Sequence, residues 1–236
     1  MTDTPLPTCT IDDGVAIISL DDGKANVFSD AVIARLEELL DEIEAGDARA
    51  VVIHGRPGRF SAGFDLAEMT ASADSMRALV TRGARWWARL YGFGRPVVAA
   101  CTGHALAGGA ITLLACDVRI GADVPAKIGL SEVTIGMPLP RFAVELARDR
   151  LTKASFTMST MGGTVYDPAG AATVGYLDRV VPEDQVLPEA LAAARALGAL
   201  RTGAFARTKT NARSAVIALL LAEVDEDMAT IDVPTP

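Results

Sequence analysis

Two glycine-containing segments of this sequence have residue types and a spacing that point to chemistry. Gly108 and Gly109 stand where a β-branched run gives way to an apolar helix, and Phe64 stands in a similar segment, residues 60–66 (FSAGFDL). The first N–H groups of a helix have no partner within it, and the helix dipole places positive potential beside them. Two such segments on neighbouring strands can direct two N–H groups at one developing oxyanion. Taken singly, each segment is also explained as a tight turn.

Glu132 is the candidate acid or base. It lies in residues 128–137 (IGLSEVTIGM), which are otherwise almost wholly apolar. A carboxylate in such surroundings either faces solvent at an edge or is partly buried with a raised pKa, as proton transfer at neutral pH requires. The composition leaves both interpretations open. His54 and His104 flank the two glycine segments, and a catalytic role or a satisfied loop position would each explain them.

Composition excludes several classes of protein. The 236 residues carry a net charge of −8 without a basic stripe, which argues against a nucleic-acid partner. Two histidines and three cysteines show no metal-ligand spacing, so we expect no metal site. The polar, acidic opening MTDTPLPTCTIDD has no secretion signal, and a cytoplasmic location is expected.

The uncharged run between Arg95 and Asp117 is about as long as a membrane span, roughly twenty residues. Its glycines, threonines and histidine favour a buried strand followed by a buried helix instead, and we expect no membrane association.

The elements around these residues follow an α/β pattern. Ser29 is a suitable N-cap for a helix over 30–44, and Gly46 suits its end. Strands are predicted over 15–18, 50–53, 96–101, 117–120 and 176–181, and further helices over 74–92, 142–151, 152–161, 168–174, 182–201 and 204–228.

Together these segments resemble the crotonase (enoyl-CoA hydratase/isomerase) superfamily. The resemblance rests on DDGKANVFS at 21–29, FSAGFDL at 60–66, GHALAGGAITLLACD at 103–117, IGLSEVTIGMPLP at 128–140 and GYLDRVVPEDQV at 175–186. It implies an α/β fold, a crotonase-like spiral of ββα units with a C-terminal helical region, assembled as a homotrimer or a dimer of trimers. The spiral core would span residues 1–181, and residues 182–236 would form a helical oligomerisation or lid region.

The resemblance also implies a site. Carried over position by position, it assigns the oxyanion-hole amides to Phe64 and Gly108, which would polarise the thioester carbonyl of an acyl-CoA and stabilise an enolate. The coenzyme A thioester would be the substrate, with no permanently bound cofactor. Contacts along the CoA are implied at Lys24, Ala25, Ala62, Asp65, Leu66 and Lys209.

One departure from the family pattern is informative. Typical hydratases of the family carry two glutamates; the second matches Glu132, but the first would lie at Ile111. Water addition needs two proton-handling groups, whereas one carboxylate can carry a proton between two carbons. The pattern therefore resembles the 3,2-trans-enoyl-CoA isomerase branch. A hydratase using Glu132 and one water, with Asp65 or His104 as a second group, and a non-catalytic acyl-CoA-binding protein are the alternatives.

Overall fold

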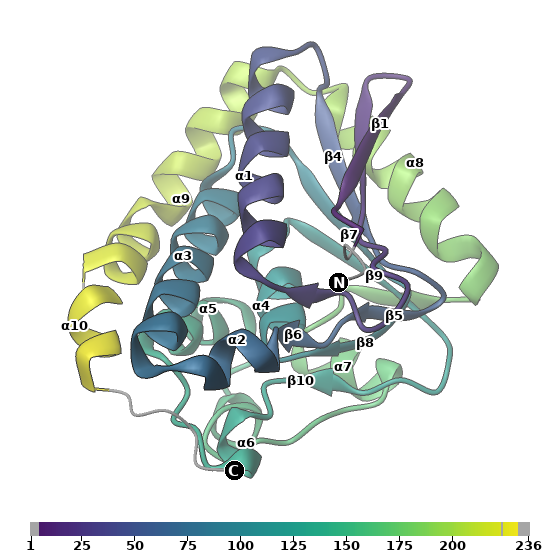
Figure 1. Cartoon of the computed structure of the whole chain (residues 1–236). Helices are drawn as coiled ribbons and strands as arrows, with labels where there is room; N and C mark the ends of the chain where they lie inside the picture. The colour runs from purple at the N-terminus through teal and green to yellow at the C-terminus, as the bar shows by residue number, and fades with distance from the viewer. Residues whose placement is uncertain (1–4, 223, 231–236) are drawn as a thin grey trace.

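The computed structural model describes residues 5–222 and 224–230 and has a six-stranded sheet at its centre (Figure 1). The first two strands form an antiparallel hairpin, and all the remaining neighbouring pairs of this sheet are parallel. The hairpin turns at Asp13 and Gly14, which both have positive φ, as is typical of an Asp-Gly turn. In spatial order the strands are β1 (Thr8–Asp12), β2 (Val15–Ser19), β4 (Ala50–His54), β7 (Val97–Cys101), β9 (Val118–Ala122) and β11 (Arg179–Val181).

Two smaller sheets, which the sequence analysis does not predict, carry the segments of interest. The three-stranded sheet is parallel, with the order β10 (Ile128–Gly129), β8 (Gly103–Leu106), β5 (Gly58–Ser61). A second pair joins β3 (Val27–Phe28) to β6 (Gly63–Phe64), also in parallel. These strands have two to four residues, too few for an alternating pattern to be visible in the sequence.

The chain repeats one unit: a strand of the six-stranded sheet (the large sheet), a strand of the three-stranded sheet (the small sheet), then helical structure (Figure 1). This arrangement confirms the predicted spiral of ββα units. The helices of the three turns are α2 (Leu66–Ala71) with α3 (Ala73–Gly92), α4 (Gly108–Ala115), and a 3₁₀ turn (Glu132–Ile135) with α5 (Arg141–Arg150).

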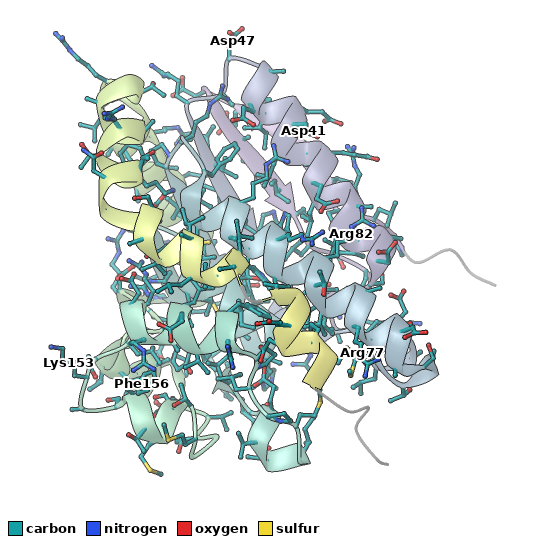
Figure 2. All side chains as sticks on the ribbon, turned by 90° about the vertical axis from the view of Figure 1, so that its left-hand side faces the viewer. Asp41, Asp47, Arg77, Arg82, Lys153 and Phe156 are labelled. Atoms are coloured by element: carbon teal, nitrogen blue, oxygen red, sulfur yellow. The ribbon has the colours of Figure 1, made fainter. Side chains whose placement is uncertain are left out.

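Helix α1 (Asp30–Ala45) confirms the predicted helix and its caps. The Ser29 hydroxyl accepts the Val32 N–H at 3.2 Å, and Gly46 N–H donates to the carbonyl of Glu42. Its polar face is joined to α3 by ion pairs, including Arg82 with Glu37 (Figure 2).

The last part of the chain is helical, but its elements differ from the prediction. Residues 152–161 contain only one short helix, α6 (Phe156–Ser159), and α7 (Pro168–Val174) follows. The predicted helix over 204–228 is two helices, α9 (Thr202–Ala222) and α10 (Val224–Thr230), which pack against α3 and α5.

The helices that follow the predicted boundary at residue 182 pack against the preceding part of the chain. Helix α8 (Val186–Gly198) lies on one face of the large sheet and buries Val186, Ala190 and Ala194 against it. Its apolar stripe closes a second core with residues from β2, β4, β7 and β9. The role of the C-terminal helices in oligomerisation remains a prediction.

Candidate active site

Three short segments leave the carboxyl ends of the small sheet's neighbouring strands and contain the candidate chemistry. After β5 the chain reaches Phe64, after β8 it reaches Gly108, and after β10 it reaches Glu132. Ala107 N–H donates to the Gly129 carbonyl at 3.1 Å, so the second and third segments start side by side. The carboxyl ends of parallel strands are where α/β proteins gather ligand-binding groups.

The segments of Phe64 and Gly108 touch through their glycines. A Cβ atom added to Gly63 would lie 3.0 Å from the Gly108 nitrogen, and one added to Gly108 would lie 3.2 Å from the Gly63 Cα. Asp65 N–H donates to the Phe28 carbonyl at 3.1 Å.

Gly108 begins helix α4 after an unusual residue. Ala107 has φ +50° and ψ −119°, a backbone conformation that costs a non-glycine residue free energy and is typical of functional turns. The first intrahelical bond runs from Ile111 N–H to the Ala107 carbonyl. The Gly108 N–H therefore precedes the hydrogen-bonded helix and has no partner within it.

Glu132 combines partial exposure with a buried oxygen. The residue as a whole is half-buried, but Oε2 is fully buried and has no hydrogen-bond partner among the described residues. Burial raises the pKa of Glu132 to about 7, against a smaller opposing effect of its own backbone N–H and that of Ser131. Of the two sequence interpretations, this geometry fits the partly buried carboxyl rather than one that faces solvent.

The position of the missing glutamate is filled by core packing. Ile111 is 2% exposed and lies within the main hydrophobic cluster. Asp65 is the N-cap of α2, where Oδ1 accepts the N–H groups of Ala67 and Glu68 at 2.8 and 3.2 Å.

The histidines are engaged by backbone groups. His104 Nδ1 accepts the Lys127 N–H at 3.0 Å. Burial lowers the pKa of His104, and the charges of Arg59 and Lys127 lower it further. His54 Nδ1 lies 2.9 Å from the Gly55 carbonyl. Both histidines are satisfied by backbone groups, as the non-catalytic interpretation expects, although they lie in strands β4 and β8 rather than in loops.

The aromatic ring of Phe64 packs into helix α3. It makes an edge contact with Trp87 at 5.3 Å, and a Cβ on Gly83 would lie 2.7 Å from the ring. Phe142 stacks on the other side of Trp87. Gly83 thus leaves room for the Phe64 ring and supports the site. The sequence analysis does not identify it, and the only signal in the sequence is the size of the Phe64 side chain.

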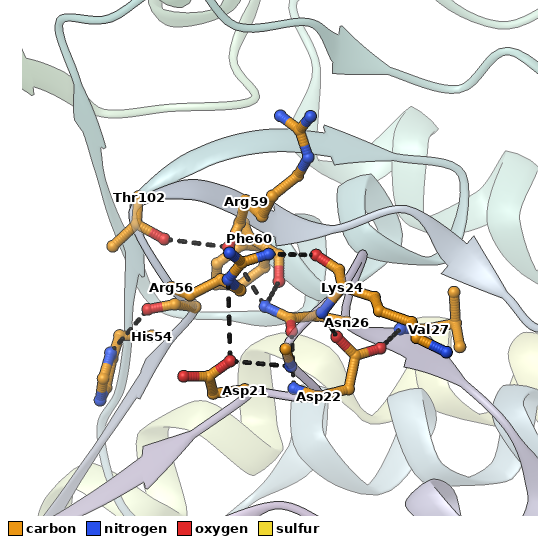
Figure 3. A network of polar contacts seen from close by, with 12 residues as sticks. Asp21, Asp22, Lys24, Asn26, Val27, His54, Arg56, Arg59, Phe60 and Thr102 are labelled. Carbon is orange, nitrogen blue, oxygen red and sulfur yellow. Dashed lines mark hydrogen bonds and ion pairs between the residues drawn. The ribbon is translucent and has the colours of Figure 1, made fainter. Parts of the chain in front are cut away.

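Of the residues expected along the CoA, Lys24, Ala25 and Ala62 are brought together, and Figure 3 shows Lys24 in the polar network around Asn26 and Arg56. Ala62 N–H donates to the Ala25 carbonyl at 3.0 Å, and Arg56 donates to the Lys24 carbonyl at 2.6 Å. The Asn26 side chain, in a residue with φ +54°, donates to the carbonyls of β5. These bonds hold the early turn against the Phe64 segment and leave the Lys24 side chain exposed.

Leu66 opens helix α2 directly after the Asp65 cap, and its side chain is 69% exposed. An apolar side chain so exposed beside the Phe64 segment is available for contact with a ligand. The predicted contacts at Asp65 and Leu66 thus lie next to the site.

Lys209 lies apart from the other residues expected along the CoA. Its side chain is 6% exposed and its ammonium pairs with Asp117 at 2.8 Å, as does the Arg213 guanidinium. Asp117 also accepts the N–H of Val97, the first residue of β7, so this cluster lies at the amino end of the strands. Lys209 is a structural cation at the amino ends of strands of the six-stranded sheet, whereas Glu132 follows the carboxyl end of β10 in the three-stranded sheet.

Two substitutions test the different roles of Lys209 and Lys24. Lys209→Met should lower stability by about 3–5 kcal/mol, because it leaves Asp117 without one of its two buried partners, and should not change KM for an acyl-CoA. Lys24→Ala should raise that KM about fivefold and leave stability within ~0.5 kcal/mol. Chemical denaturation and initial-rate kinetics on both variants measure this contrast, and an unstable Lys24→Ala protein with normal KM would contradict it.

Large cavities lie elsewhere. Two of about 600 and 630 Å³ lie along α3, one lined by Glu37, Arg77 and Arg82 and the other by Phe93 and Ile217. None of the candidate site residues lines them. Within residues 5–222 and 224–230, no helix is long and apolar enough to cross a membrane. In the same residues we find no group of three or more metal-ligating side chains.

Comparison with known proteins gives matches over nearly the whole chain. The sequence profile of a family described as enoyl-CoA hydratase/isomerase matches residues 10–229. Human mitochondrial enoyl-CoA delta isomerase 1 is 32% identical over 219 residues, which are 91% of this chain and 72% of that protein. A probable enoyl-CoA hydratase of Bacillus subtilis is 35% identical over 136 residues, 56% of this chain and 52% of that protein.

Solved structures share the fold. The crystal structure of an enoyl-CoA hydratase/isomerase family protein from Pseudomonas syringae superimposes with a TM-score of 0.93 at 38% identity. The superposition covers 96% of this chain and 98% of that one.

Proposed function

The chain belongs to the enoyl-CoA hydratase/isomerase family, and from this premise we propose that it moves the double bond of an enoyl-CoA ester. One observation carries the proposal. Glu132 has a buried oxygen without a hydrogen-bond partner among the described residues, and its segment starts beside the Gly108 segment, while Ile111 takes the place of a second acid. The similarity to the human protein named as a delta isomerase supports the same reaction.

In the proposed mechanism, the thioester oxygen of a 3-enoyl-CoA accepts the N–H groups of Phe64 and Gly108. The Glu132 carboxylate removes a proton from carbon 2, and the electron pair moves into a dienolate whose charge lies on that oxygen. Glu132 then returns the proton to carbon 4, which forms the 2-enoyl ester. Proton and electrons balance without water, so one carboxyl suffices.

Hydration is the second candidate, favoured by the similarity to the probable hydratase of B. subtilis. It would need Glu132 to orient a water and a further group to deliver the second proton. A protein that binds acyl-CoA without turnover is the third candidate. We also propose that the CoA thioester is substrate rather than a resident cofactor, that the enzyme acts in the cytoplasm, and that it is a homotrimer or a dimer of trimers.

A paired assay tests the proposal. The purified protein is given 3-enoyl-CoA and 2-trans-enoyl-CoA separately, and conjugation and hydration are followed by absorbance and by product analysis. We expect turnover of the first substrate at least tenfold faster than hydration of the second. Hydration at a comparable rate would identify a hydratase, and tight binding without turnover of either would identify a binding protein.

A further inference from the structure

Trp87 is a fully buried side chain of α3 that the proposed mechanism does not use. It is 0% exposed, and its indole N–H donates to the Thr112 hydroxyl at 2.9 Å. Thr112 lies on α4 and is also fully buried, and its hydroxyl donates to the Gly108 carbonyl at 2.8 Å. A chain of two hydrogen bonds therefore connects the indole to the backbone of the residue that bears one of the two proposed oxyanion-hole amides.

The backbone of Gly108 is held on both sides of its Cα. The Thr112 hydroxyl binds the carbonyl of the peptide that follows, and Ile111 N–H donates to the Ala107 carbonyl of the peptide that precedes, at 2.9 Å. A Cβ added to Gly108 would lie 3.0 Å from two ring carbons of Trp87, so the indole fills the space of a side chain there. Because a peptide is planar, these contacts together fix where the Gly108 N–H points.

The same indole contacts the residue that bears the other proposed amide. The Phe64 ring meets it edge-on, with the ring centroids 5.3 Å apart. Phe28, Trp86 and Phe142 pack around the indole, with centroid distances of 5.7, 6.0 and 5.7 Å. In such a close-packed cluster the indole turns only if its neighbours move. One rigid side chain thus touches both segments that bear the amides.

We propose that Trp87 and Thr112 are positioning residues for the oxyanion hole: they hold Gly108 in register with the Phe64 segment, so that both N–H groups meet one thioester oxygen. The inference rests on the proposed function. Donors stabilise the oxyanion only while they stay about 2.7–3.1 Å from it, and a displacement of about 1 Å can cost 10²-fold in rate. Without the hydroxyl, the buried indole N–H loses its acceptor and the Gly108 carbonyl loses this donor, and the start of α4 shifts.

Thr112→Val tests this, since valine has nearly the shape of threonine and lacks the hydroxyl. We expect kcat for double-bond transfer to fall about tenfold, with KM changed less than about twofold. Thr112→Ser keeps the hydroxyl and should retain most of the wild-type kcat. The infrared carbonyl frequency of a bound ¹³C-labelled acyl-CoA thioester reports the two hydrogen bonds directly. The wild-type protein should lower this frequency, and Thr112→Val should lower it less.

Two further variants complete the test. Trp87→Phe removes the indole N–H and the ring carbons that pack on Gly108, and should lower kcat by about 10–10²-fold. Thr210→Val is the control, because the hydroxyl of this exposed residue of α9 makes the same kind of bond, to the Ala206 carbonyl at 3.0 Å. It should change neither kcat nor the carbonyl frequency.

A purely structural role would lower the melting temperature of Thr112→Val and leave the kcat and the carbonyl frequency of the folded protein unchanged, which would overturn the inference. If Trp87→Phe is unstable, Thr112→Val alone decides. A wild-type protein that binds the acyl-CoA without lowering its carbonyl frequency would instead overturn the proposed function.

Discussion

A Glu132→Gln protein should lose about 10²–10⁴-fold in kcat for double-bond transfer, the range that a general acid–base group contributes. Glutamine matches the carboxyl in size but cannot accept a proton from carbon 2, whereas the amides of Phe64 and Gly108 remain to bind the thioester. The KM should therefore change little. Steady-state kinetics on 3-enoyl-CoA measure both quantities, and retained turnover would show that another group moves the proton.

The same variant should gain stability at neutral and alkaline pH. The pKa of Glu132 is about 7 in the folded protein against 4.5 as its ordinary value. The folded state therefore binds the proton more tightly, and wild-type stability decreases as pH rises from about 4.5 to 7. For this half-buried residue the gain in Glu132→Gln should be about 1–3 kcal/mol above pH 7 and vanish below pH ~4.5.

The wild-type pH–rate profile should reflect the same protonation of Glu132. Because the carboxylate form is the base, kcat/KM should fall as pH decreases below about 7. Glu183→Gln, which changes an exposed carboxyl, is the control for both measurements and should alter neither. A stability difference between wild type and Glu132→Gln that is independent of pH would contradict the burial of Oε2.

Glu132 could be recognised from the sequence because a lone acid among apolar residues is conspicuous. Its state could not, since the burial of Oε2 depends on contacts that only the fold makes. Likewise, Gly108 was predicted to start a helix. Its contact with Gly63 depends on the small sheet, and the two-residue strand β10 of that sheet has no periodicity.

For Lys209, the sequence could not show which partner its ammonium has in the fold. A resemblance transfers a residue type at a helical position, and the lysine is present as expected. The partner that decides its role, Asp117, lies 92 residues away and is the residue just before β9. A buried carboxylate holds the ammonium more firmly than an exposed phosphate site would, because an unpaired charge at that depth is costly.

A Gly63→Ala protein should lose about 10²–10³-fold in kcat, the typical cost of disabling one oxyanion-hole donor. Gly63 has φ +94°, and an added Cβ would lie 2.9 Å from the Ala107 Cβ and 3.0 Å from the Gly108 nitrogen. Relief of both contacts requires the two backbone segments to separate, which moves the Gly108 N–H from the oxygen it would stabilise. The strained φ adds about 1–2 kcal/mol of destabilisation.

Exchange of the carbon-2 hydrogens of a saturated acyl-CoA in D₂O measures this effect most directly, because it reports enolate formation without any movement of a double bond. Gly63→Ala should slow that exchange as much as it slows turnover. Gly203→Ala is the control, since a Cβ there meets nothing within 4 Å and α9 should tolerate it. If a folded Gly63→Ala protein exchanges at the wild-type rate, the charge develops elsewhere and the contact between Gly63 and Gly108 is only packing. If exchange and turnover fall together while acyl-CoA still binds, the two amides act on the same oxygen, and Glu132 and the glycine segments are parts of one site.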